Sequence, residues 1–153
     1  MCMYEESIRV PMLVKPPGGA ARSARSQLTQ HLDLAATFCD YAGAELMAAA
    51  ADASLRPIID SPDAPGRDAV FCEFNGNSGR GFQQRCLITP THKLIYNHRW
   101  DIECYDLAAD PGEKSNLCAD GEFSTLPAPA GALCGQLGDW MRDTGDYIEM
   151  ELT

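Results

Sequence analysis

Long apolar runs and basic side chains are scarce in this sequence of 153 residues. No apolar run approaches the ~20 residues that a membrane-spanning helix needs. The 12 Lys and Arg residues are outnumbered by 22 Asp and Glu, which gives a net charge of −10. Because a field of that sign repels phosphate groups, nucleic acid and anionic membrane surfaces are poor candidates for partners.

The motifs of several common enzyme classes are also absent. The sequence contains no GxxxxGK phosphate loop, no GxGxxG, no HExxH and no GxSxG. Its three histidines, His31, His92 and His98, are not spaced as metal ligands, and its seven cysteines form no CxxC pair. We interpret the cysteines as free and mostly buried thiols. The residue types therefore assign no catalytic residue, no metal ligand and no cofactor to this chain.

The first residues resemble no secretory leader. Glu5 and Glu6 stand where a signal peptide carries Lys or Arg, and no apolar segment of the leader type follows them. As written, the chain is expected to stay in the cytoplasm.

The second half of the sequence predicts an antiparallel sheet. Four runs of β-forming residues alternate with short polar connections, among them a hairpin turn at Pro90-Thr91-His92. These runs cover residues 69–75, 85–89, 93–97 and 103–107. Further on, four apolar side chains at helical spacing predict an amphipathic C-terminal helix that ends near Gly145 and packs on the sheet. They are Leu133, Leu137, Trp140 and Met141.

The first half predicts a strand followed by a helix. The dense apolar run Ile8–Lys15 is typical of a strand buried on both faces, although Pro11 removes one hydrogen-bond donor. Asp33 is expected to cap a helix that ends at Gly43. The apolar face of this helix is predicted to hold Leu34, Phe38, Tyr41 and Ala42.

Two loops stand out for their residue types. Asp110-Pro111-Gly112-Glu113 has the pattern of a capping box and predicts a helical turn through Leu117, rather than a calcium loop. The loop from Glu73 to Arg80, EFNGNSGR, combines glycines with groups that can bind hydroxyls and an anion. Its candidate substrate-binding residues are Glu73, Asn75, Asn77 and Arg80, and the alternative is an ordinary polar connection.

Several segments, in their order and spacing, resemble the sulfatase family of the alkaline phosphatase superfamily. Met3–Val14, MYEESIRVPMLV, resembles the family segment "MYEE-x-x-R-x-P", and Asp33–Gly43 resembles "DLAPT…AG", with Ala36 in place of Pro. The series RCLIT, HKLIYN, ECYDL, DPGE and NL, within residues 85–117, resembles the C-terminal sulfatase signature. The ending Trp140-Met141-x-x-Thr144-x-Asp146 also fits such chains. Only residues 44–68 and 119–130 lie outside the resemblance.

The resemblance also shows what this sequence does not contain. Sulfatases use a formylglycine made in a C/S-x-P-x-R motif, calcium-binding acidic residues, and a Lys a few residues before MYEE. None of these is present. Sulfate-ester cleavage needs a nucleophile, a cation and a proton donor, so calcium and formylglycine are expected only in a full-length parent.

The expected architecture is therefore α+β. Residues 1–68 would be a strand-and-helix remnant of the large α/β sulfatase domain. Residues 69–153 would form a small antiparallel sheet of about four strands with a packed C-terminal helix. Without its sheet neighbours, the segment Ile8–Lys15 is expected to expose apolar side chains.

Three functions fit this interpretation. The chain is the C-terminal part of a sulfatase and inactive alone; or it is a non-catalytic module that binds sulfated glycans or a partner; or it is one half of a split hydrolase completed in trans by the missing N-terminal half. The parent's substrate would be a sulfated small molecule or glycan. Related phosphonate and phosphodiester hydrolases share the architecture and stay open.

Overall fold

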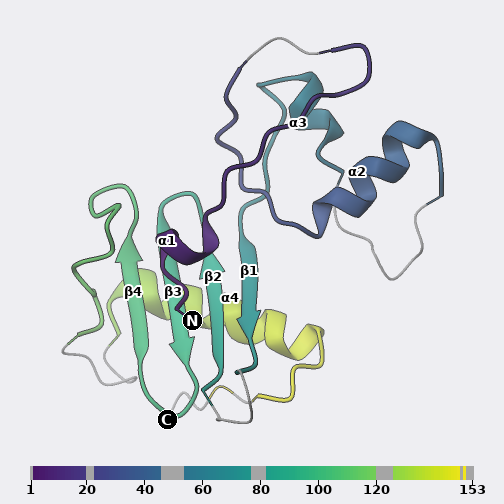
Figure 1. The fold of residues 1–153 in the computed structure, drawn as a ribbon. Coiled ribbons are helices and arrows are strands. Elements are labelled where there is room, and N and C mark those ends of the chain that lie inside the picture. Colours follow the sequence, from purple (N-terminus) through teal and green to yellow (C-terminus); the bar gives the residue numbers. More distant parts are fainter. Residues whose placement is uncertain are drawn as a thin grey trace. The chain divides into compact units, whose positions relative to one another are not determined.

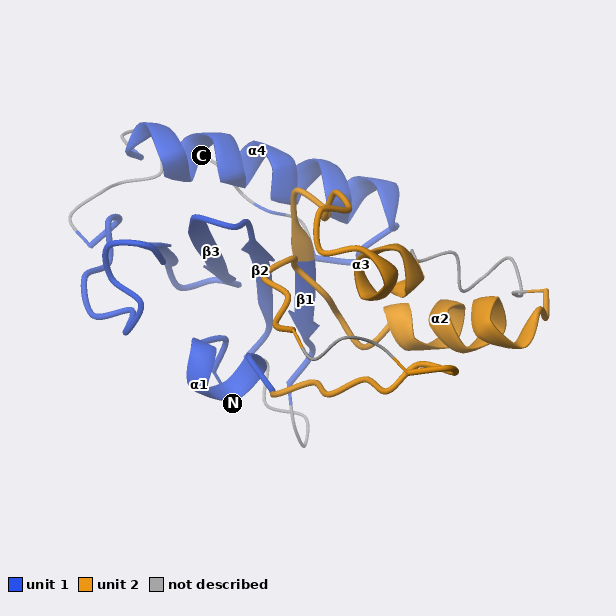
Figure 2. Cartoon of the chain, turned by 90° about the horizontal axis from the view of Figure 1, so that it is seen from above, with its two compact units in different colours: residues 1–10, 71–153 blue, residues 11–70 orange. Residues whose placement is uncertain are grey.

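The computed structural model divides the chain into two compact units, one formed by residues 1–10 and 71–153 and the other by residues 11–70 (Figure 2). The structure describes residues 2–19, 23–45, 54–76, 82–119, 126–148 and 150.

The first unit is built on one four-stranded sheet with strand order β1-β2-β3-β4 (Figure 1). Neighbouring strands run antiparallel, and Gln84 pairs with Asn97 across β2 and β3. The predicted meander is confirmed, and each strand end lies within one residue of its expected position. The strands are β1 (Val70–Phe74), β2 (Gln84–Ile88), β3 (His92–Asn97) and β4 (Ile102–Asp106).

Helix α4 (Ala128–Asp143) covers one face of this sheet, as predicted. Its buried side chains include Leu133, Leu137 and Met141, which face an apolar sheet surface that contains Leu87 and Leu94. Burial of each such side chain stabilises the fold by about 1.5–3 kcal/mol. None of the described helices is long and apolar enough to cross a membrane.

Helix α1 (Glu5–Ile8) lies on the opposite face of the sheet, as Figures 1 and 2 both show. The strand predicted over Ile8–Lys15 is wrong for this structure, because residues 9–16 adopt neither helix nor strand. A strand needs a hydrogen-bonded neighbour, and none of β1 to β4 pairs with this segment. The predicted exposure of its apolar side chains is confirmed, most clearly at Leu13, which is 99% exposed.

The second unit contains α2 (Asp33–Ala42) and α3 (Arg56–Asp60). Gly43 ends α2 in the left-handed conformation, as predicted. Asp33 does not cap the helix, because it is itself the first helical residue and its carboxylate binds Arg67 and the Gln30 amide.

The predicted apolar face of α2 is also wrong. Phe38 is exposed, whereas Ala36 and Thr37 are buried. The Thr37 hydroxyl donates to the Asp33 carbonyl at 2.7 Å and accepts from the Leu55 amide at 2.8 Å. These polar contacts, rather than the apolar periodicity, decide which side of α2 is buried.

The turn after β4 differs from the predicted helical turn. Residues 110–117 form no helix. The Asp110 carboxylate accepts hydrogen bonds from the amides of Lys114 and Ser115, so it organises the loop as expected of a capping residue. Glu113, however, does not return to Asp110. It takes a positive φ of 50°, and its carboxylate points into the protein.

Candidate functional site

Polar side chains gather at three places in the first unit, and the first of them includes the predicted loop. Arg85 of β2 is fully buried and binds Asp146 through two hydrogen bonds, with Nη2 2.8 Å from Oδ1. Tyr147 stands beside this pair, with its ring 5.9 Å from the guanidinium carbon. The hydroxyl of Tyr147 donates to Asn75 Oδ1 at 3.0 Å.

The structure therefore brings two of the four predicted loop residues to this cluster. Glu73 lies 4.0 Å from Arg85 Nε and is 56% exposed, and Asn75 is held by Tyr147. Asn77 and Arg80 lie outside the described residues. Their role in binding substrate, like that of Glu73 and Asn75, stays a prediction.

The electrostatics of this cluster are those of an anchored ion pair. Hydrogen bonds from Arg85 lower the pKa of the Asp146 carboxyl, and backbone amides of Tyr147 and Ile148 act in the same direction against the effect of burial. Asp146 therefore remains a carboxylate near neutral pH and holds the end of the chain against β2. Both of its oxygens accept hydrogen bonds from Arg85, and Oδ1 also accepts from the Ile148 amide, which is the geometry of a structural anchor.

The second cluster is a buried lysine with two carboxylates. Lys93 of β3 has no exposed side-chain surface, and its Nζ lies 2.7 Å from Glu5 Oε1 and 2.7 Å from Glu113 Oε1. Glu113 also accepts a hydrogen bond from the backbone amide of Glu5 at 2.6 Å. This arrangement joins α1, β3 and the loop after β4, three segments that are distant in sequence.

The third cluster lies on the same face of the sheet, around Glu103 of β4. Tyr4 and Tyr105 donate to Glu103 Oε2 at 2.7 and 2.6 Å, and Asn97 donates to Oε1 at 2.7 Å. The bond to Glu103 raises the pKa of Tyr4, and burial followed by the same carboxylate raises the pKa of Tyr105. Both phenols are therefore donors that stay protonated at neutral pH.

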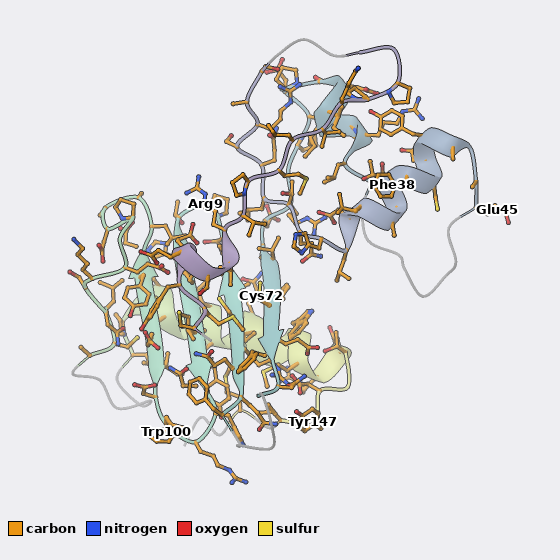
Figure 3. All side chains as sticks on the ribbon, in the orientation of Figure 1. Arg9, Phe38, Glu45, Cys72, Trp100 and Tyr147 are labelled. Carbon is orange, nitrogen blue, oxygen red and sulfur yellow. The ribbon has the colours of Figure 1, made fainter. Side chains whose placement is uncertain are left out.

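The hairpin between β3 and β4 completes this cluster at its outer edge. Arg99 takes a left-handed φ of 66°, which lets the connection turn tightly while Trp100 remains 77% exposed. Figure 3 shows Trp100 and Tyr147 at the same end of the sheet, Trp100 at the β3–β4 turn. Asp101 accepts a hydrogen bond from Asn97 at 2.7 Å.

The carboxylates of the second and third clusters do not fit a calcium ion. Lys93 occupies Glu5 and Glu113, and three hydrogen-bond donors occupy Glu103. Within the described part of the chain, no group of three His, Cys, Asp or Glu residues could hold a metal ion. These carboxylates therefore act as partners of buried donors and hold segments of the chain together.

Sequence reasoning missed most of these residues. In the sequence, Lys93 looks like a solvent-facing strand residue, and Gln84 and Glu103 look like ordinary polar side chains at the ends of strands. One signal was available: Lys93 and Asn97 share a face because strand side chains alternate, and Glu103 stands opposite Ile95 on that face. Three polar positions on one face of the predicted sheet indicate a polar contact surface.

Three comparisons with known proteins agree on one family. Residues 1–130 match the family model described as "N-sulphoglucosamine sulphohydrolase, C-terminal". An N-acetylglucosamine-6-O-sulfatase of Bacteroides thetaiotaomicron is 32% identical over 130 residues, which cover 80% of this chain and 23% of that protein. A Delta 4,5-hexuronate-2-O-sulfatase of the same organism is 31% identical over 163 residues, covering 97% of this chain and 32% of the relative.

Solved structures show the same relationship. A protein whose structure was solved in complex with its substrate D-glucosamine-2-N,6-O-disulfate superposes with a TM-score of 0.62 at 25% identity, covering 75% of this chain and 24% of that one. The chain thus spans about a quarter to a third of the length of the sulfatases that it matches.

Proposed function

The chain belongs to the family of N-sulphoglucosamine sulphohydrolase C-terminal domains, and from this premise we propose that it serves as the C-terminal part of an enzyme that hydrolyses sulfate esters of glycans. Support for a glycan substrate comes from the two curated relatives and from the substrate named for the solved structure. Relatives act at different positions of different sugars, so the position of the sulfate is left open.

The chemistry of such an enzyme would come from residues outside this sequence. Formylglycine would supply the nucleophile and calcium would neutralise the sulfate oxygens, as the sulfatase resemblance implies. Among the described residues, the carboxylates of these clusters instead already bind Lys93 or accept a hydrogen bond from Asn97. We therefore assign the chain a positioning role rather than a reacting one.

The observation that carries this proposal is the buried attachment of the segment Met3–Ile8 to the sheet. Lys93 binds Glu5, and Glu103 binds Tyr4, so this segment is held at two points. In the sulfatase resemblance, a conserved family Lys lies a few residues before this segment. Fixing Tyr4 and Glu5 on the sheet would fix the direction from which the part of the enzyme that carries this Lys approaches the sheet.

A second surface suits contact with the large sulfatase domain. Val10, Leu13 and Val14 are exposed in the segment that follows α1. Exposed apolar side chains in succession are typical of a surface that another part of a protein covers. We propose that the N-terminal part of a sulfatase covers them, either within one polypeptide or as a separate chain.

The first test measures hydrolysis of an aryl sulfate with calcium. The purified chain alone should give no turnover. The chain produced together with an N-terminal sulfatase portion that carries C-x-P-x-R should copurify with it and give turnover. Turnover by the chain alone would contradict the positioning role, and so would the absence of any complex or activity on co-expression.

A matched pair of variants tests the attachment itself. Glu5→Gln weakens the ion pair with Lys93 and should lower the activity of the assembled enzyme, whereas Glu6→Gln, an exposed neighbour of the same chemistry, should not. Equal activity in both variants would refute the proposed role of the segment. Titration with heparin at low salt addresses the alternative of a non-catalytic glycan-binding module, which predicts binding without any assembled enzyme.

A further inference from the structure

Gln84 in β2 has a buried hydrogen-bond acceptor that nothing in the described chain uses. Its side chain is 4% exposed, and its Nε2 donates to Asn97 Oδ1 at 2.7 Å. The other atom of the amide, Oε1, is buried and has no hydrogen-bond partner among the described residues. A buried acceptor without a donor is unfavourable, and in native proteins it often marks a place where a ligand or water binds.

The hydrogen-bond network fixes which atom of the Gln84 amide is free. Asn97 Nδ2 lies 2.7 Å from both Asp101 Oδ1 and Glu103 Oε1. A carboxylate accepts but cannot donate, so this atom of Asn97 must be the amide nitrogen. Asn97 Oδ1 must then accept from Gln84 Nε2, which leaves Gln84 Oε1 as the unused acceptor.

Gln84 lines an open pocket of about 260 Å³ beside the β3–β4 hairpin. Tyr4, Trp100, Asp101 and Glu103 also line it. This volume is several times the ~30 Å³ that one water molecule occupies in the liquid. It is below the ~300–1,000 Å³ of pockets for drug-sized ligands, so it suits a molecule no larger than a single sugar or a short amine.

The charge of the pocket selects the chemistry of its ligand. Asp101 and Glu103 are both acidic, and none of the ion pairs among the described residues involves either of them. The pocket therefore disfavours a sulfate or any other anion. The N–H groups of Asn97 point at both carboxylates, which also disfavours a bare metal ion between them.

A ligand that donates hydrogen bonds and carries positive charge satisfies every feature of the pocket. We propose that the pocket binds the primary ammonium group of a small organic molecule, which donates to Gln84 Oε1 and to the Asp101 carboxylate. The exposed ring of Trp100 covers the cation or the carbon skeleton next to it, as aromatic rings do for ammonium groups.

Three probes of graded chemistry test the proposal with the full chain. Glucosamine carries an ammonium on a sugar, n-butylamine carries it without a sugar, and N-acetylglucosamine is the sugar without the charge. Binding is followed by the NMR signal of the Trp100 indole N–H, assigned with Trp100→Phe. Binding of both amines supports recognition of the ammonium alone, and binding of glucosamine only supports an amino sugar. Equal binding of N-acetylglucosamine and glucosamine, or no binding by any probe, would overturn the proposal.

Two charge-matched variants complete the test. Asp101→Asn removes one exposed carboxylate of the pocket and should weaken amine binding about 10- to 100-fold, the loss expected for one charged hydrogen bond. Asp139→Asn removes an exposed carboxylate on α4, across the sheet, and should leave the affinity unchanged. Equal effects of the two variants would show that only the general negative charge attracts the amine, and the assigned pocket would be wrong.

Discussion

Replacing Lys93 by Met should destabilise the first unit more than any exposed charge substitution. The Lys93 side chain is fully buried and stands between Glu5 and Glu113, each 2.7 Å from its ammonium. Without the ammonium, Glu113 remains as a buried carboxylate, with the amide of Glu5 as a hydrogen-bond donor. Breaking a buried ion pair by removing one partner costs about 3–5 kcal/mol.

This magnitude is large in comparison with the total stability of a domain. Native domains are stable by about 5–15 kcal/mol, so Lys93→Met should remove a substantial fraction of it. At about 2–4 °C per kcal/mol for a chain of this size, the midpoint of thermal unfolding should fall by about 6–20 °C. The free energy of unfolding is measured by urea denaturation, followed by far-UV circular dichroism.

Lys114→Met is the matched control because it makes the same chemical change at an exposed position of the neighbouring loop. Its effect should stay within about 0.5 kcal/mol. The double variant Lys93→Met/Glu113→Gln should be more stable than Lys93→Met alone, because it removes the unpaired buried charge while keeping an acceptor for the Glu5 amide. A loss below about 1 kcal/mol for Lys93→Met, or no recovery in the double variant, would refute this reasoning.

Three further predictions concern pH, thiols and the exposed segment. Because Arg85 lowers the pKa of Asp146, their pairing stabilises the fold above the unfolded carboxyl pKa of ~3.9 and is lost as pH falls through the lower folded value. Asp146→Asn should therefore cost about 3–5 kcal/mol at pH 6 and less at pH 3 in urea denaturation, and a pH-independent difference would contradict this. Burial raises the pKa of the Cys104 thiol to about 12 and that of the Cys134 thiol to about 11. Both thiols should therefore react with a disulfide reagent at pH 8 only after urea is added. Rapid reaction of the folded protein would contradict their burial. Leu13→Glu should leave stability within about 0.5 kcal/mol but reduce self-association in light scattering, since Leu13 is fully exposed, and unchanged association would count against an exposed apolar contact.

The sheet and α4 could be predicted because their patterns are local and consistent. Each strand is a short run of β-formers with polar ends, and the α4 stripe at Leu133, Leu137 and Met141 matches the helical period. The turn after β2 has few alternatives once both strands are placed. Such elements follow from period and turn chemistry alone.

The segment Ile8–Lys15 could not be predicted in the same way. Its composition indicates a strand, but a strand exists only with a partner, and β1 to β4 provide none. The prediction of the buried face of α2 failed for a similar reason. Thr37 accepts a hydrogen bond from the Leu55 amide, a contact between residues distant in sequence. Propensity describes what a segment can form, whereas its neighbours decide what it does form.

The candidate sites were the least predictable part. Glu73 and Asn75 are predicted from residue types in a glycine-containing loop, and the structure places Glu73 near Arg85 and Asn75 against Tyr147. The free acceptor of Gln84 has no sequence signal at all. It depends on the register between β2 and β3, on the orientation of Asn97 and on the position of two acids across a turn.

The two faces of the sheet have different consequences for how a sulfatase would assemble. The α4 face is apolar around Leu87 and Leu94, where shape and volume decide the packing, and it carries one buried ion pair, Arg85 with Asp146. The α1 face joins distant segments through directional contacts, Lys93 to Glu5 and Tyr4 to Glu103, which hold only one alignment. Under the proposed function, a segment that orients the part of the enzyme preceding it needs a fixed direction more than a large contact area. A polar face suits that task better than an apolar one, since a shift of one residue would leave buried charges unpaired.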